Sequence, residues 1–166
     1  MEGHEIVLTA DRSFMSDYHL LPFLRGLRFA STGVLSPSLF FRFVSPPIPK
    51  TQSGKALLAP YYTRRTEAAL INSGFNENQV IVTAPENSVN FISSKTKIVS
   101  VTARDPLSRI HHYSLLNPLC KESYGSLSFK KLVRKLHFFR LSKKYRFKIV
   151  VEGPGAWQLA NPEDMR

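Results

Sequence analysis

Four short runs of apolar and β-branched residues most constrain the fold that this chain can adopt. They are residues 5–10, 79–84, 96–103 and 147–151. Each run is nearly continuously apolar rather than alternating, which is typical of a strand buried on both faces. Segments with helix signals lie between the runs, and strands that alternate with helices form parallel sheets. The sequence therefore predicts an α/β fold, an open and mostly parallel Rossmann-like or flavodoxin-like sheet with helices on both faces.

The segments between the expected strands differ in their helix signals. Thr63 can cap a helix that ends near Gly74. Residues 85–92 predict a short turn or helix, and either Ser126 or Ser128 can cap a long helix that extends to about residue 145. The apolar residues of this long helix recur at helical spacing, as Phe129, Leu132, Val133, Leu136 and Phe139. The expected order is strand, insertion, helix, strand, helix, strand, helix, strand.

A segment rich in prolines and aromatic residues interrupts this order at about residues 14–62. Its prolines, among them Pro46, Pro47 and Pro49, exclude regular strand ladders, so we expect an irregular insertion with a short strand or helix. The 166 residues otherwise fit a single domain. Because doubly wound sheets commonly have five or more strands, we expect this sheet to be truncated at its C-terminal end.

Composition limits the classes of function. No apolar stretch approaches the roughly 20 residues that span a bilayer, so we expect no membrane partner. The acidic start lacks a secretory signal, and we therefore expect a cytoplasmic protein. Cys120 is the only cysteine, which excludes an intrachain disulfide and any multi-cysteine metal site within this chain.

The positive charge is concentrated in one stretch. The formal net charge is +11, and residues 121–148 contain ten basic residues and one acidic residue. On a helix at about residues 126–146 these side chains could neutralise phosphates, so a nucleic-acid-binding module is one open interpretation. A solvated face of a covering helix, or a face that docks an acidic domain, explains the same charges.

Three loops follow the carboxyl ends of expected strands, where ligands bind in open α/β sheets. They are residues 11–16, 104–110 and 152–157. Thr102 and Asp105, beside the second loop, could form hydrogen bonds with a ligand. An aspartate before a proline is also typical of an Asx turn, in which Asp105 would bond its own backbone.

Two glycines give the third loop unusual freedom. Gly153, Pro154 and Gly155 follow the last expected strand, where glycine lets a backbone approach a ligand closely or form an ordinary tight turn. This arrangement differs from the dinucleotide fingerprint, which places G-x-G-x-x-G after the first strand. Residues 11–16 contain no glycine at all, which disfavours NAD or FAD.

Residues 6–16, 59–70, 101–107 and 151–159 form four motifs in a characteristic order. Together they resemble the N-terminal region of radical SAM proteins that carry a cobalamin-binding-type domain. The resemblance implies a Rossmann-like corrinoid-binding domain followed by a barrel that holds a [4Fe–4S] cluster through C-x-x-x-C-x-x-C and cleaves S-adenosylmethionine. The sequence lacks that cysteine motif. The cluster and S-adenosylmethionine would then belong to a missing barrel domain or subunit, and this chain would not be catalytic by itself.

The resemblance also implies which residues would surround cobalamin. Thr102 matches the serine or threonine at a strand end, and Asp105 lies in the loop after it. Gly153, which Pro154 and Gly155 follow, matches the second glycine of a Gly-Gly element near the nucleotide tail. Glu152 stands in place of the first glycine, where its carboxylate would obstruct or repel that tail.

The loop after the first strand departs further from the family. A D-x-H-x-x-G motif would begin with Asp11 and Arg12, but Ser13 replaces the cobalt-ligating histidine and Ser16 replaces the glycine. Ligation by that motif is therefore unsupported. We expect either a cobalamin-binding domain or a domain that only docks a radical SAM barrel, with the basic nucleic-acid-binding module as the alternative.

Overall fold

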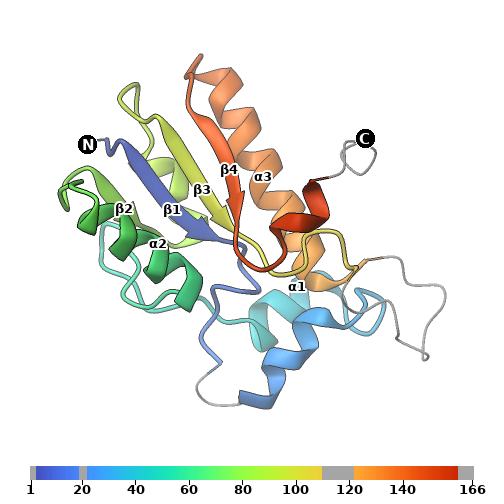
Figure 1. Cartoon of the computed structure of the whole chain (residues 1–166). Coiled ribbons are helices and arrows are strands. Elements are labelled where there is room, and N and C mark those ends of the chain that lie inside the picture. The colour runs from blue at the N-terminus through green and yellow to red at the C-terminus, as the bar shows by residue number, and fades with distance from the viewer. Residues whose placement is uncertain (1–2, 19–21, 110–121, 161–166) are drawn as a thin grey trace.

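The computed structural model describes residues 3–18, 22–109 and 122–160 (Figure 1). Four strands form one sheet in the order β2-β1-β3-β4, and all neighbours are parallel. The strands are β1 (Ile6–Ala10), β2 (Val80–Val82), β3 (Ile98–Thr102) and β4 (Lys148–Glu152). The prediction of an open, parallel α/β fold of Rossmann-like type is confirmed, with each strand within its expected run or one residue beyond it.

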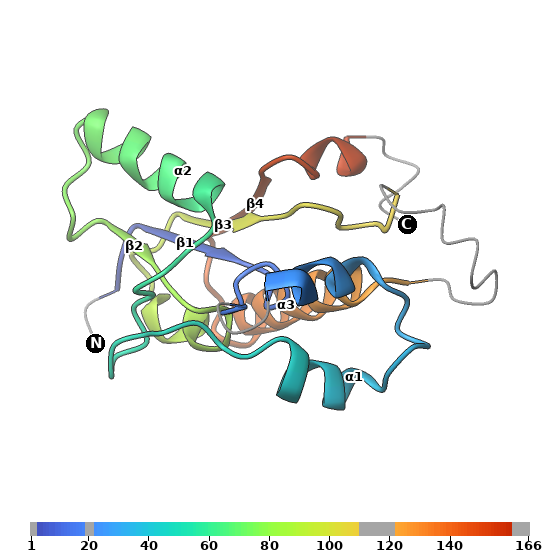
Figure 2. The same cartoon turned by 90° about the horizontal axis from the view of Figure 1, so that it is seen from below.

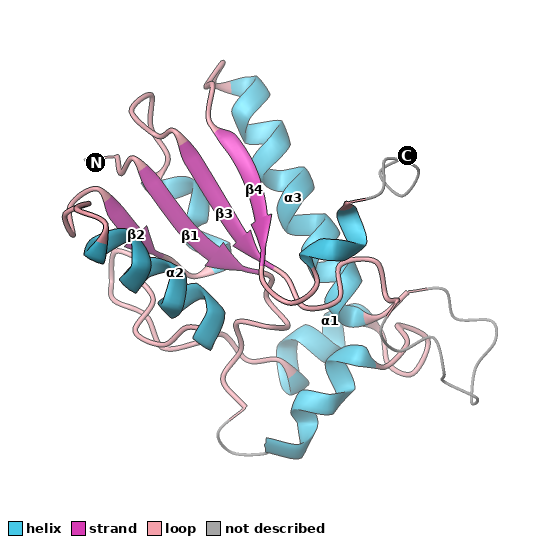
Figure 3. Cartoon of the chain, in the orientation of Figure 1, coloured by secondary structure: helices cyan, strands magenta, loops and turns pink. Residues whose placement is uncertain are grey.

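The connections between strands cover both faces of the sheet, as predicted (Figures 2 and 3). Helix α2 (Tyr61–Asn72) leads into β2 and packs on one face. The 3-10 helix η3 (Pro85–Phe91) and the long helix α3 (Tyr124–Ser142) lie together on the other face. Within the described ranges, no helix combines the length and apolarity that crossing a membrane requires.

One hydrophobic core lies on each side of the sheet. Successive strand residues point to opposite faces, so Val7 enters the core beneath α3 and η3 while Leu8 enters the core beneath α2. The first core includes Leu136 and Phe147, both almost fully buried. Every residue of β1 is buried because this strand lies between β2 and β3.

Helix α2 begins earlier than its predicted cap. Pro60 occupies the N-cap position and the helix starts at Tyr61, so the prediction that Thr63 caps the helix is wrong. The proline ring restricts the backbone of Pro60 to an angle suited to a helix entrance. Thr63 is buried within the first turn, and its hydroxyl shares a hydrogen bond with that of Thr102 at the end of β3.

Helix α3 also begins earlier than predicted. Ser123 is the N-cap, and its hydroxyl accepts a hydrogen bond from the backbone nitrogen of Ser126. The predicted caps lie inside the first turns of the helix and have other partners. The hydroxyl of Ser126 donates to the carbonyl of Pro106, and that of Ser128 donates to Asp11.

Strand β4 is an edge strand that is only partly buried, with Val150 42% exposed. The interpretation of its apolar run as a strand covered on both faces is therefore wrong. Its only strand neighbour within the described ranges is β3, and α2 packs on β1 and β2 instead. Apolar residues at an edge give the same sequence pattern as a central strand.

The described residues of the insertion between β1 and α2 form an irregular segment with three short helical stretches. They are η1 (Pro22–Phe29), α1 (Pro37–Leu39) and the π-helical turn η2 (Phe40–Val44). The Phe40 ring stacks on Tyr124 of α3 with 3.7 Å between ring centres, and the Tyr124 hydroxyl donates to the carbonyl of Leu35. These contacts place the insertion beyond the carboxyl ends of the strands (Figure 1).

Candidate ligand pocket at the carboxyl ends of the strands

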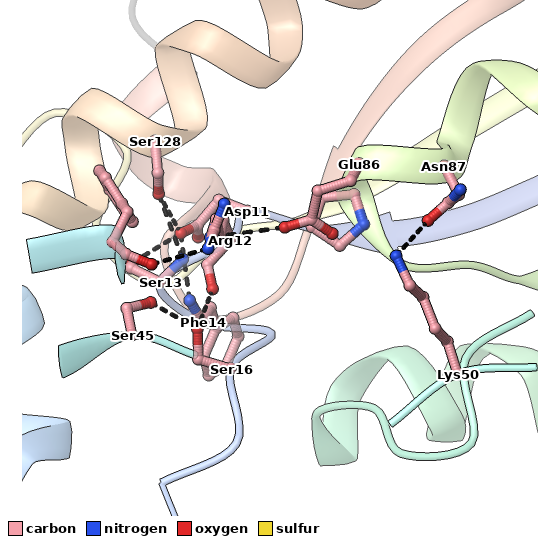
Figure 4. Close-up of polar contacts among 12 residues, drawn as sticks. Asp11, Arg12, Ser13, Phe14, Ser16, Ser45, Lys50, Glu86, Asn87 and Ser128 are labelled. Carbon is pink, nitrogen blue, oxygen red and sulfur yellow. Dashed lines mark hydrogen bonds and ion pairs between the residues drawn. The ribbon is translucent and has the colours of Figure 1, made fainter. Parts of the chain in front are cut away.

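Asp11, the first residue after β1, joins the loop that follows β1 to helix α3 (Figure 4). Its Oδ1 atom accepts hydrogen bonds from the hydroxyls of Ser13 and Ser128 and from the backbone nitrogen of Phe14. Asp11 is 4% exposed, and burial raises the pKa of its carboxyl, although the hydrogen bonds from Ser128 and Ser13 oppose this rise. Asp11 therefore organises the loop internally.

Arg12 and Ser13 point away from each other. The Arg12 guanidinium donates to the carbonyl of Phe41 at 2.7 Å, and its Nε lies 3.4 Å from Oε1 of Glu86 (Figure 4). Ser13, in the position of the cobalt-ligating histidine, is 1% exposed and turns inward to Asp11. Arg12 lines a pocket of about 290 Å³ together with Phe41 and Glu86, and Ser13 does not line it.

Thr102 lies in a chain of side-chain hydrogen bonds between β3, β4 and α2. Its hydroxyl lies 2.8 Å from that of Thr63 and donates to Oε1 of Glu152 at 3.0 Å. Thr66 donates to the other carboxylate oxygen of Glu152 at 2.6 Å. The Thr102 hydroxyl that the resemblance assigns to cobalamin is thus buried and bonded within the chain.

The Gly153-Pro154-Gly155 loop packs directly on the chain that leaves β3. Gly153 has a φ of +91°, and a Cβ atom there would lie 2.9 Å from the carbonyl oxygen of Ala103. At Gly155 a Cβ atom would lie 2.3 Å from the carbonyl oxygen of Arg104. The two glycines therefore allow close backbone packing between neighbouring loops, which corresponds to the tight-turn interpretation.

Asp105 joins the same two loops. Its Oδ1 atom accepts hydrogen bonds from the backbone nitrogen of Arg109 at 2.7 Å and from the side-chain amide of Gln158 at 2.8 Å. Gln158 is fully buried, and its oxygen accepts from the backbone nitrogen of Leu107. Asp105 thus bonds a nearby backbone nitrogen, as an Asx-type residue does. Residues 110–121, which contain the end of the predicted loop 104–110, lie outside the described residues.

A pocket of about 450 Å³ lies at the loops after β1 and β3 and is lined by none of the eight predicted site residues. Its walls come from the loop after β1, from η1, from the approach to α2 and from Arg104 after β3. The lining residues are Phe14, Met15, Ser16, Asp17, Tyr18, Arg25, Arg28, Ile48, Leu58, Ala59, Pro60, Tyr61, Tyr62 and Arg104. The chain runs from β1 outward to β2 and then back to β3, so the pocket lies where the strand order reverses. This is the place where open α/β sheets bind ligands.

One residue that lines the pocket, Arg28, is a buried arginine. Arg28 is 9% exposed, and its guanidinium lies over the rings of Phe14 and Phe29, at 5.1 and 4.7 Å from their centres. Arg104 lies 5.2 Å from the centre of the same Phe29 ring. Burial and the nearby charge of Arg104 lower the pKa of Arg28. Sequence reasoning reached Arg104 through its loop but missed Arg28, since nothing local distinguishes it from the other basic residues of the insertion.

Two bases of α3 have polar partners within the chain, of which one is a carboxylate. Lys130 pairs with Glu122 at 2.8 Å, and Lys135 donates to the carbonyl of Glu86 at 2.7 Å. Burial lowers the pKa of Lys135. The Lys135 residue is nevertheless exposed as a whole, and so are other bases on α3 and in the turn to β4, namely Lys131, Arg134, Lys143, Lys144 and Arg146.

Two further observations bear on cofactors. In the part of the chain that the structure describes, His, Cys, Asp and Glu side chains nowhere gather in a group of three or more that could hold a metal ion. The groups that the resemblance assigns to the corrinoid tail, Thr102 and Gly153, are packed or hydrogen-bonded within the chain. Comparisons with protein-family models, with curated proteins and with solved structures gave no match.

Proposed function

We propose that this chain is a ligand-binding α/β domain that binds a small molecule over the carboxyl ends of β1 and β3. The observation that carries this proposal is the position of the 450 Å³ pocket at the point where the strand order reverses. Its volume falls within the usual range of about 300–1,000 Å³ for small-molecule sites. Apolar residues such as Ile48 and Leu58 and polar groups contribute about equally to its lining, which makes it more polar than most small-molecule sites.

The test uses a variant that fills the pocket. Ala59 lines the pocket just before α2, so Ala59→Trp places an indole there. Ala68→Trp adds the same side chain to an exposed position on α2 outside this pocket. Native mass spectrometry of freshly purified protein is expected to show a retained small molecule in the wild type and in Ala68→Trp but not in Ala59→Trp. Equal masses of bound material in all three proteins would contradict the proposal.

The corrinoid ligand and the radical SAM partner stay predictions that rest on the resemblance. Hydroxocobalamin titration, followed by the visible spectrum and by retention on a desalting column, tests the first. Replacing Thr102 or Gly153 by a bulky residue would disturb packing in any case, because both positions are tightly surrounded. Ala59→Trp is therefore the informative variant. Retention that this variant abolishes would support a corrinoid in the pocket, and absence of retention would refute it.

The exposed bases favour a second candidate function, binding of nucleic acid. Lys143, Lys144 and Arg146 lie in the turn before β4, at the opposite end of the sheet from the pocket, and Phe138 on α3 is 74% exposed. Basic side chains can neutralise phosphates, and an exposed aromatic ring can stack on nucleobases. This function predicts binding of single-stranded oligonucleotides that weakens steeply with salt and that Lys143→Ser with Lys144→Ser reduces. Salt-independent or absent binding would refute it.

A further inference from the structure

The Arg28 side chain is the feature of the pocket that folding alone does not explain. Only 9% of the residue is exposed, and its Nε atom has no hydrogen-bond acceptor within the described ranges. Buried guanidinium groups normally have acceptors, since removing a charge from water is costly. Replacing a buried charge by a well-packed apolar side chain is often neutral or stabilising. The buried charge therefore points to a role other than stability.

The neighbours of Arg28 hold its side chain without supplying that acceptor. Phe14 and Phe29 offer ring faces, which attract a cation but accept no conventional hydrogen bond from it. Asp11 interacts electrostatically with Arg28, but the Oδ1 atom of Asp11 already accepts three hydrogen bonds from other groups. Arg104 shares the Phe29 ring and brings a second positive charge close by. An anion between these two guanidiniums would relieve their repulsion and complete the hydrogen bonding of Arg28.

The charges of the whole pocket agree with such an anion. Among the described residues, its lining contains Arg25, Arg28 and Arg104 but only one acidic residue, Asp17, so their formal charge is +2. Tyr61 and Tyr62 line the same pocket and are 71% and 40% exposed, which leaves aromatic surface for a planar group. A phosphate monoester carries about −1.5 to −2 charges at neutral pH, which balances this lining.

We propose that Arg28 and Arg104 bind the phosphate of a small phosphate monoester whose planar ring contacts Tyr61 and Tyr62. The planar guanidinium can donate two parallel hydrogen bonds to a phosphate, which an ammonium group cannot do with the same geometry. Arg28 supplies the buried contact and Arg104 the exposed one. This inference rests on the proposed function, because it names the chemistry of the ligand that the same pocket binds.

The test compares AMP with adenosine, which share a planar base and differ by the phosphate. Isothermal titration in a low-salt buffer without phosphate or sulfate gives both affinities. We expect AMP to bind more tightly than adenosine, and Arg28→Met to lower the AMP affinity by about 10- to 100-fold while leaving that of adenosine nearly unchanged. Arg42→Met is the matched control, since Arg42 also lies over a ring, that of Phe43 at 5.4 Å, but does not line the pocket.

Arg28→Met provides a second readout without any ligand. Methionine retains much of the packing on Phe14 and Phe29 but removes the buried charge, so the variant is expected to unfold at the same temperature as the wild type or above it. If Arg28→Met does not fold, Arg104→Met reports instead, because Arg104 is exposed. Inorganic phosphate alone is expected to raise the unfolding temperature of the wild type and not that of Arg28→Met.

The outcomes separate this inference from the proposed function. Equal affinities for AMP and adenosine that Ala59→Trp abolishes would overturn the phosphate site and leave the ligand pocket standing. Unchanged AMP affinity in both Arg28→Met and Arg104→Met would also overturn it, as would failure of both AMP and inorganic phosphate to bind. AMP binding that survives Ala59→Trp would place the phosphate outside the pocket and contradict the inference, whereas a different ligand retained in the pocket would still support the proposed function.

Discussion

Removal of the Thr102 hydroxyl tests whether the polar chain between β3, β4 and α2 is a structural element. Thr102→Val preserves the shape of a side chain that is fully buried but deletes both of its hydrogen bonds, to Thr63 at 2.8 Å and to Glu152 at 3.0 Å. A neutral hydrogen bond contributes about 0.5–1.5 kcal/mol and one to a charged group about 1.5–3 kcal/mol. The expected loss in the free energy of unfolding is therefore about 2–4 kcal/mol.

Urea denaturation followed by far-ultraviolet circular dichroism measures this loss. Thr102→Ser is the matched control, because it retains the hydroxyl and removes one methyl group, which costs about 1 kcal/mol. A double-mutant cycle with Thr63→Val isolates the direct contact, since the two losses are expected to be less than additive. A Thr102→Val protein within about 0.5 kcal/mol of the wild type, with the same denaturant dependence, would refute the reasoning.

Three other substitutions test separate features. Asp11→Asn removes a carboxyl whose pKa burial raises, so in the wild type the native state binds a proton more tightly than the unfolded state does. The stability of the wild type relative to the variant is therefore expected to rise as the pH is lowered from about 7 to about 4. A difference that stays constant or falls as the pH is lowered would contradict this. Gly155→Ala forces a Cβ atom against the backbone of Arg104 and is expected to destabilise the chain by about 1–3 kcal/mol, measured by thermal unfolding. Gly26→Ala is the control and is expected to change stability little, because no atom lies near the position of the added Cβ. Leu136→Ala in the buried core is expected to cost about 2–5 kcal/mol in chemical denaturation, and a loss no larger than that of the 61% exposed Leu141→Ala would count against the assigned core.

The sheet could be predicted because its signal is local. A run such as residues 5–10 carries its own apolar pattern, and the alternation of strands with helices restricts how the strands can be ordered. The errors arose where a distant contact decided the outcome. Thr63 has the composition of a cap, but the hydroxyl of Thr102 lies beside it in the folded chain. Likewise, the run in β4 resembles a central strand and lies at an edge.

The residues that line the candidate pocket differ from the site residues that the sequence suggests. The rule that ligands bind at the carboxyl ends of strands indicates the loops after β1, β3 and β4, and the pocket is lined by residues of the first two. Asp11, Thr102, Asp105 and Gly153 drew attention because polar residues and glycines at strand ends are common in binding sites. In this chain they hold the loops together. Arg28 could not be distinguished, because only folding removes it from water.

The lining of the pocket comes almost entirely from the insertion and not from the strands of the sheet. Met15, Tyr18, Arg28 and Ile48 all line the pocket and all belong to the insertion, whereas the buried strands contribute none of its lining residues. Loops tolerate insertion and replacement far better than the elements they connect. A change of ligand preference in a lineage of such domains could therefore proceed largely by exchanging this one segment while the sheet and the core beneath α3 and η3 stay as they are. The core beneath α2 would change with it, because Met15, Ile48 and Ala56 belong to that core.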